Sequence, residues 1–352
     1  MPAMSRLKLK LQFADFWHPR TEKEIRANYL YQFLERYYDL ELSENPDFFL
    51  YSVYGVEYLK YDCLRIHYTP ENTRPNFRKC DYAFSFDLGE SERNIRLPYY
   101  KFAEGFSELG RPRRPDAVIA ENRGFCSFVN SNNEVPDRLR FFDALSRYKR
   151  VDAGGKSRNN IGYLVGDKNE FLRRYKFTIA FENSCHPGYT TEKLMQALVA
   201  DTVPIYWGNP AVAVDFNPAA FINCHDYDSF DAVIARVREV DADEALYRSY
   251  LAAPVFPGGR PNECLDDGRI HSRVRPHFHL APPLRAPLRQ KNSAGRVFLP
   301  PPLPARREKM GWNAPALGGQ GHEKSVPVHA AAGPILLLKG DFPDSMNLSR
   351  QP

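Results

Sequence analysis

The residues best suited to chemistry lie in one stretch, FENSCHPGYTTEK, at residues 181–193. An apolar run ends at Glu182, a polar loop follows, and helix-compatible sequence begins near Thr190 or Thr191. Ligands of an open parallel sheet bind beyond the carboxyl ends of its strands. A helix N-terminus there presents free N–H groups and a positive dipole end, which favour phosphate. Lys193 has the wrong charge for a first helical turn, so a bound anion would account for it, although an exposed lysine is the ordinary alternative.

A second cluster, GGKSRNN, occupies residues 154–160. Glycines allow a backbone to approach a ligand closely, and Arg158 can hold two phosphate oxygens at once. The G-x-x-x-x-G-K spacing of a Walker loop is absent. Taken alone, the cluster fits a solvated turn better than a phosphate site.

A third cluster, YTPEN at residues 68–72, places Glu71 directly after the β-favouring run at 64–68. A lone glutamate in such a place is ordinarily a surface residue or a helix cap. Its type and position therefore leave both a structural and a chemical role open.

Two D-x-D strings, at residues 226–228 and 241–243, could hold a divalent ion that bridges a sugar-nucleotide diphosphate. Each precedes or opens a helical pattern, where aspartate is a normal N-terminal residue. We interpret both strings as helix caps and expect no essential metal and no cofactor. H-E-x-x-H and G-x-S-x-G motifs are absent, so the sequence gives no support for a zinc hydrolase or a serine hydrolase.

Short strands alternate with helices along most of the chain, which predicts an α/β protein. The run from 177 to 207 reads as strand, polar loop, helix and strand, the repeating unit of a nucleotide-binding sheet. Strands are expected near 7–13, 48–54, 64–68, 81–86, 95–99, 124–129, 177–181, 203–207 and 221–224, and helices near 21–38, 137–147, 191–200 and 230–240.

The last part of the chain, residues 276–352, differs from the rest because it holds 13 of the 29 prolines and loses hydrophobic periodicity. Such a segment cannot bury enough surface to offset its ordering entropy, so we predict a disordered tail. The tail carries ten basic and four acidic residues, whereas the first 275 residues carry 38 and 39. A nearly neutral body argues against nucleic acid as a partner.

Cysteine spacing and hydropathy indicate a cytoplasmic protein. No C-x-x-C pair occurs among the six cysteines, which are Cys63, Cys80, Cys126, Cys185, Cys224 and Cys264. The N-terminus has no apolar signal core, and no run reaches the ~20 apolar residues needed to span a bilayer. Peripheral contact with the inner face of the cytoplasmic membrane is left open.

In this order, the clusters resemble bacterial α-1,3/1,4-fucosyltransferases of glycosyltransferase family 10. The resemblance runs from about Leu7 to Ile270. The segments that carry it are YKFTIAFENS (175–184), GYTTEK (188–193), VPIYWGNP (203–210), RGFCSFVNSN (123–132), GGKSRN (154–159) and YTPEN (68–72). The FENS…GY-x-TEK block is the most specific of these.

The resemblance implies a GT-B fold, in which two Rossmann-like domains face a cleft. We expect an acceptor-binding domain at 1–150, a GDP-fucose-binding domain at 151–275 and the basic tail at 276–352. By motif, Glu71 would be the general base, Arg158 and Lys193 would hold the diphosphate, and Asn183, Tyr189 and Glu192 would contact ribose and fucose.

The implied reaction is inverting transfer of L-fucose from GDP-β-L-fucose to a hydroxyl of an N-acetylglucosamine-type oligosaccharide acceptor, in α-1,3 or α-1,4 linkage. Glycan or lipopolysaccharide O-antigen synthesis would be its setting. Another inverting sugar-nucleotide transferase and a non-catalytic sugar-binding module are the alternatives.

Overall fold

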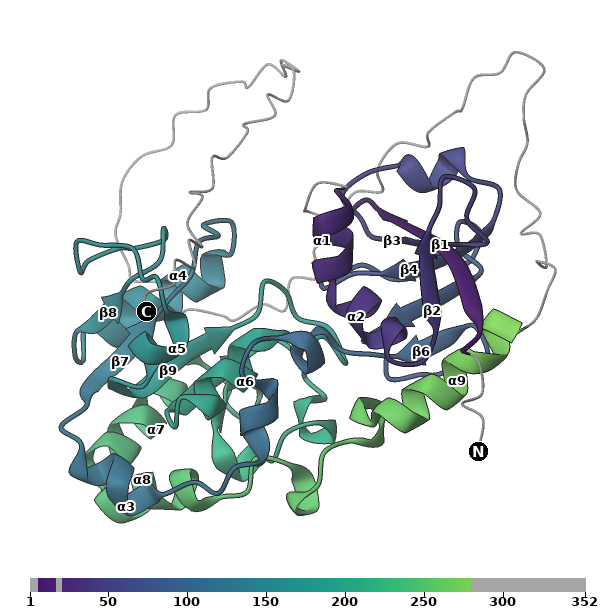
Figure 1. Cartoon of the computed structure of the whole chain (residues 1–352). Coiled ribbons are helices and arrows are strands. Elements are labelled where there is room, and N and C mark those ends of the chain that lie inside the picture. Colours follow the sequence, from purple (N-terminus) through teal and green to yellow (C-terminus); the bar gives the residue numbers. More distant parts are fainter. Residues whose placement is uncertain (1–5, 17–20, 280–352) are drawn as a thin grey trace, which may run out of the picture. The chain divides into compact units, whose positions relative to one another are not determined.

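A computed structural model describes residues 6–16 and 21–279, which contain two parallel β-sheets (Figure 1). The disordered tail predicted for 276–352 lies outside the described residues, except that 276–279 belong to the last helix. Within the described ranges, the helices are α1 (Glu22–Ala27), α2 (Tyr29–Glu35), α3 (Pro115–Ala120), α4 (Pro136–Ser146), α5 (Lys168–Leu172), α6 (Glu192–Val199), α7 (Phe230–Ala242), α8 (Glu244–Ala252) and α9 (Asp267–His279).

The first sheet has the strand order β2-β1-β3-β4-β5-β6, and every pairing is parallel. Its described strands are β1 (Lys8–Ala14), β2 (Asp39–Leu42), β3 (Phe48–Tyr51), β4 (Leu64–Tyr68), β5 (Tyr82–Ser85) and β6 (Asn94–Arg96). Because all strands run the same way, the loops after β1, β3, β4, β5 and β6 leave from one edge of the sheet.

One face of this sheet is covered by α1, α2 and α9. Side chains such as Leu11 and Leu50 pack there against Phe33 of α2 and Ile270 of α9, all nearly fully buried. The opposite face carries a smaller aromatic cluster around Phe49, next to the 3₁₀ turn η1 (Glu57–Lys60).

The second sheet has the strand order β11-β10-β9-β7-β8, again with parallel pairings. Its described strands are β7 (Gly124–Phe128), β8 (Val151–Ala153), β9 (Tyr175–Phe181), β10 (Val203–Trp207) and β11 (Ile222–Asn223). In β9, Phe177, Ile179 and Phe181 face a core shared with α4, α7 and α8, while Ala180 packs toward α6. A strand covered on both faces has a continuous apolar sequence, and this pattern is why the sequence predicts the strand at 177–181.

The sheets divide the chain earlier than the boundary predicted between residues 150 and 151. β7 and α4 already belong to the second sheet, since Cys126 of β7 pairs with Phe177 of β9. The chain also returns at its end, because Ile270 and Val274 of α9 are buried in the core of the first sheet. The sequence predicts neither fact, because a local pattern does not specify which sheet a strand joins or against which sheet a helix packs.

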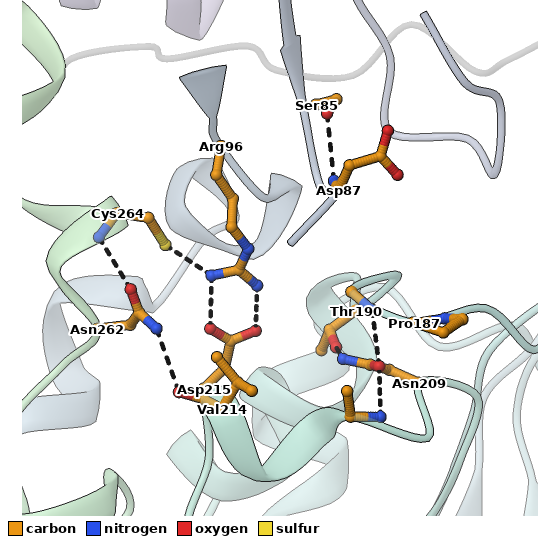
Figure 2. A network of polar contacts seen from close by, with 12 residues as sticks. Ser85, Asp87, Arg96, Pro187, Thr190, Asn209, Val214, Asp215, Asn262 and Cys264 are labelled. Atoms are coloured by element: carbon orange, nitrogen blue, oxygen red, sulfur yellow. Dashed lines mark hydrogen bonds and ion pairs between the residues drawn. The ribbon is translucent and has the colours of Figure 1, made fainter. Parts of the chain in front are cut away.

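A buried ion pair connects β6 to the chain that follows β10 (Figure 2). The Arg96 guanidinium donates to both carboxylate oxygens of Asp215, at 2.8 and 2.6 Å, and to Cys264 Sγ at 2.8 Å. Arg96 is 4% exposed and Asp215 is fully buried. A bidentate pair of this kind is geometrically specific, so it fixes the position of β6 relative to these two loops.

Candidate active site

Glu182 is the first residue after β9 and begins the loop at 182–191, which connects β9 to α6. Its carboxylate is fully buried and accepts hydrogen bonds from the Thr191 backbone N–H at 2.7 Å and the Thr191 hydroxyl at 2.6 Å. Burial raises the pKa of Glu182. Thr191 is the N-cap residue of α6, but its hydroxyl turns toward Glu182 and does not cap the helix. Glu182 therefore holds the two ends of the loop together.

Lys193 lies at the centre of a charged cluster at the start of α6. Its ammonium group is 3.3 Å from Glu182 Oε2 and 3.4 Å from Glu192 Oε1, and it donates to Thr191 Oγ1 at 2.8 Å. Burial opposes the charge of Glu192, but Lys193 and Lys168 lower its pKa to about 2. The glutamate is thus ionised under all ordinary conditions, and the lysines face a fixed negative charge.

Lys168 is a member of this cluster that the sequence analysis missed. It is the first residue of α5, after the N-cap Asp167, and its charge interacts with Glu192 and Lys193. Burial lowers the pKa of Lys168. The signal that had singled out Lys193, a lysine in the first turn of a helix, also applies to Lys168, but no neighbouring motif drew attention to it.

The tip of the loop packs against the first sheet. Gly188 has a φ of 86°, and a Cβ there would lie 2.3 Å from the Phe86 carbonyl oxygen, so only glycine fits. The ring centroids of Tyr189 and Phe86 are 5.0 Å apart, and Tyr189 is 2% exposed. Asn209, after β10, supports the loop by accepting from the Gly188 N–H at 2.7 Å and donating to Thr190 at 3.0 Å (Figure 2).

Asn183 is fixed by a buried arginine that the sequence analysis did not single out. Arg138 of α4 is fully buried and donates to Asn183 Oδ1 at 2.7 Å and to the Glu182 carbonyl at 2.8 Å. Arg138 therefore orients the amide of Asn183 and adds a further cation close to Glu182. Nothing in the local sequence of an amphipathic helix separates this arginine from an exposed one.

Glu71 follows β4, as predicted, at the carboxyl edge of the first sheet. The adjacent Asn72 donates to Ser184 Oγ at 2.7 Å, which joins the YTPEN loop to the FENS loop. The Glu71 carboxylate accepts a hydrogen bond of 2.7 Å from the Tyr54 hydroxyl. Two motifs 112 residues apart are thus in direct contact.

Tyr99 is the first residue of the 3₁₀ turn η2 (Tyr99–Phe102). Charged groups from the Glu71 loop and from the start of α6 act on its phenol. Burial raises its pKa, and Glu192, Lys193 and Glu71 all act on it electrostatically. The candidate base and the charged cluster at α6 therefore lie within electrostatic range of the same phenol.

Arg158 follows β8, so its loop leaves the second sheet at the same edge as the FENS loop. Its backbone has a φ of 55°, and its half-exposed side chain forms an ion pair of 2.7 Å with Asp143. This ion pair engages one terminal nitrogen of the guanidinium. Its role in holding a diphosphate stays a prediction.

The capping interpretation is confirmed for the D-x-D string at 241–243, through Asp243, and is wrong for the string at 226–228. Asp243 does cap α8, by accepting from the Leu246 N–H at 3.0 Å. In the other string Ser229, and neither aspartate, caps α7, while Asp226 accepts from an asparagine side chain. The Asp241 carboxylate forms ion pairs with two lysines. Within residues 6–16 and 21–279, no three His, Cys, Asp or Glu side chains gather as a metal site would require.

Comparisons with known proteins agree with the motifs. Residues 11–103 match the family model for the alpha-(1,3)-fucosyltransferase FucT N-terminal domain, and residues 119–252 match that for the C-terminal part of glycosyltransferase family 10 (fucosyltransferase). The Helicobacter pylori alpha-(1,3)-fucosyltransferase FucT is 36% identical over 291 residues, which is 71% of this chain and 61% of the relative. A human 4-galactosyl-N-acetylglucosaminide 3-alpha-L-fucosyltransferase is 34% identical over 189 residues, or 52% of this chain and 49% of the relative.

A solved structure of alpha1,3-fucosyltransferase with GDP-fucose superposes with a TM-score of 0.70 at 30% identity, covering 80% of this chain and 94% of that one. The chain belongs to glycosyltransferase family 10. This membership confirms the family that the motifs predicted, and the two parallel α/β units confirm the expected GT-B fold class. The family 10 chain spans less than two thirds of the length of the curated relatives given above.

Among the described residues of this family 10 chain, none of the helices combines the length and apolar character that crossing a membrane requires. The location in the cytoplasm and a peripheral membrane contact stay predictions.

Proposed function

We propose that this family 10 chain transfers L-fucose from GDP-β-L-fucose to a hydroxyl of an N-acetylglucosamine-type oligosaccharide, with inversion at the transferred carbon. One observation carries the proposal: the Asn72–Ser184 hydrogen bond brings the Glu71 loop against the loop that leads to Lys193. The charges of Glu71 and of the cluster at the start of α6 both act on Tyr99, which supports a shared site for the carboxylate and the cations. The similar proteins named above are fucosyltransferases, which supports this donor class.

In the proposed reaction the cations serve the leaving group. GDP departs as a diphosphate, which needs charge neutralisation more than protonation. Lys193 and Lys168 can supply this charge from a partly buried site, where electrostatic interactions are stronger than in water. Arg158 would join them. No step of this scheme requires a metal ion.

Glu71 is the proposed general base. As the acceptor oxygen bonds to the anomeric carbon and the bond to the diphosphate oxygen breaks, the acceptor proton passes to the Glu71 carboxylate. Direct displacement converts the β-linked donor into an α-linked product. We further propose an α-1,3 or α-1,4 linkage and a setting in glycan or O-antigen synthesis.

Glu71→Gln tests this proposal because it keeps the shape of the side chain but removes the proton acceptor. Loss of general-base assistance should lower kcat by ~10²–10⁴-fold, while the Kd for GDP stays near that of the wild type. Glu44→Gln is a matched control, because Glu44 also accepts a tyrosine hydroxyl, from Tyr61 at 3.2 Å, and has no proposed role.

A panel of GDP-fucose, GDP-mannose and UDP-sugars, with linkage analysis of the product, tests the donor and the stereochemistry. Turnover with another donor in preference to GDP-fucose would favour a different inverting transferase. Binding without turnover of any donor would favour a sugar-binding module. Wild-type kcat in Glu71→Gln would show that the base lies elsewhere.

A further inference from the structure

Tyr54 is an exposed aromatic residue whose hydroxyl is directed at Glu71. The hydroxyl donates to Glu71 Oε1 at 2.7 Å, although 45% of the residue is exposed. Burial and the Glu71 carboxylate both raise the pKa of Tyr54, so its hydroxyl keeps the proton and remains a donor. The contacts that hold the loop around Tyr54 therefore decide where its hydroxyl lies.

The loop that carries Tyr54 is held by Asp15, the residue after β1. The Asp15 carboxylate accepts from the backbone N–H groups of Glu57 at 2.9 Å and Tyr58 at 3.1 Å, and the Asp15 carbonyl accepts from the Tyr54 N–H at 2.9 Å. The loop between β3 and η1 is thereby held at Tyr54 itself and again at Glu57 and Tyr58.

Two features show that this arrangement is close-fitting. Asp15 has a φ of 62°, a left-handed conformation that costs energy for a residue with a side chain. A Cβ on Gly55 would lie 2.2 Å from Asp15 Oδ1, so a side chain at this position would displace the Asp15 carboxylate. Backbone strain of this kind persists where the surrounding contacts over-determine the conformation, often beside functional groups.

The hydrogen bond has a direct consequence for the Glu71 carboxylate. It occupies Oε1 and so restrains the carboxylate, while the Glu71 backbone N–H donates to Thr69 Oγ1 at 3.0 Å. The second oxygen, Oε2, is the one to which we assign the acceptor proton. A general base must lie within hydrogen-bond reach of the proton it removes, so a restraint on the carboxylate affects the rate.

We propose that Tyr54 is a positioning residue for Glu71 and that Asp15 holds Tyr54 in the required place. The inference rests on the proposed function, in which Glu71 Oε2 receives the proton of the acceptor hydroxyl as the acceptor oxygen displaces GDP. Tyr54 itself exchanges no proton and forms no bond to the sugar.

Tyr54→Phe removes the hydroxyl and keeps the ring. We expect kcat to fall by ~10–100-fold, because an error of about 1 Å in a catalytic group can cost ~10² in rate. The KM for GDP-fucose should stay within about twofold. Tyr61→Phe is the matched control, since it removes an equivalent tyrosine–glutamate hydrogen bond, to Glu44, that serves no proposed chemistry.

A double-mutant cycle separates positioning from a general structural effect. If Tyr54 acts through Glu71, the Tyr54→Phe/Glu71→Gln variant should be no slower than Glu71→Gln alone. Gly55→Ala should reproduce the loss of kcat by displacing Asp15, and GDP binding by each variant reports whether the fold is intact.

The outcomes distinguish this inference from the proposed function. A wild-type kcat in Tyr54→Phe, with Glu71→Gln strongly impaired, would overturn the positioning role and leave the base assignment standing. A rise in acceptor KM at unchanged kcat would show that the ring contacts the acceptor and would also overturn it. A wild-type kcat in Glu71→Gln would contradict the proposed base, and the inference with it.

Discussion

The replacement Lys168→Met tests whether the cluster at the start of α6 binds the donor diphosphate. Lys168 and Lys193 together lower the pKa of Glu192 from 4.5 to about 2, against the opposing effect of burial. This net difference corresponds to roughly 3 kcal/mol in favour of the ionised form of Glu192, and both lysines contribute to it. The charge of Lys168 therefore acts at the place where we expect the diphosphate.

The expected size of the effect follows from the strength of a hydrogen bond between charged groups. A hydrogen bond to a charged group contributes about 1.5–3 kcal/mol, which corresponds to a factor of roughly 10–100 in affinity. We expect Lys168→Met to raise the Kd for GDP and the KM for GDP-fucose by about that factor. Isothermal titration calorimetry with GDP and initial-rate kinetics measure the two quantities.

The controls are a second lysine and a charge-conserving variant. Lys79→Met removes an exposed lysine that has no place in the proposed site and should leave the Kd unchanged. Lys168→Arg should recover much of the affinity. A Kd for GDP within about twofold of the wild type in Lys168→Met would refute a diphosphate contact and leave Lys168 as a structural partner of Glu192.

The charge of Lys168 also predicts a pH dependence. Burial lowers its pKa below the ordinary 10.5, and only the protonated form attracts a diphosphate. Affinity for GDP should therefore fall as the pH rises toward 10, and Lys168→Arg should weaken this fall because arginine keeps its charge. If the affinity for GDP depended on pH identically in the wild type and in Lys168→Arg, the reasoning would be contradicted.

Further predictions concern the other charged groups. Arg96→Met leaves the Asp215 carboxylate buried without its partner, and we expect a loss of about 3–5 kcal/mol in the free energy of unfolding, measured by denaturant titration; a loss below 1 kcal/mol would contradict this. Burial opposes the charge of Asp241, but two lysines lower its pKa below 3.8, so its stabilising contribution is present at neutral pH and is lost as the pH falls through the lowered value. The difference in unfolding free energy between the wild type and Asp241→Asn should thus shrink in strongly acidic solution, and a difference independent of pH would oppose the assignment. Arg158→Ala should lower kcat/KM for GDP-fucose by ~10-fold or more if its guanidinium binds phosphate. EDTA should leave the rate unchanged. A rate that EDTA abolishes and Mn²⁺ restores would contradict the metal-free scheme.

The sequence by itself predicted most of the elements that carry the site. The apolar runs of β9 and β10 begin or end within two residues of their predicted limits, because strands buried on both faces have a continuous hydrophobic pattern. The motifs also identified the family, since the spacing of FENS and TEK around a β-loop-α unit is specific. Short elements such as β2, β8 and α5 escaped, because three to five residues contain too little periodicity to be recognised.

Tertiary structure alone decided which of these residues act together. The sequence placed β7 before the domain boundary, and only strand pairing assigned it to the second sheet. The hydrogen bonds from Asn72 to Ser184 and from Tyr54 to Glu71 join segments 112 and 17 residues apart, and no local pattern encodes them. Lys168 looked like any helical lysine until α5 was placed beside Glu192. Local sequence determines strands, helices and the chemical types of their loops, whereas pKa values, ion pairs and the partners of a catalytic carboxylate depend on distances that only the folded chain sets.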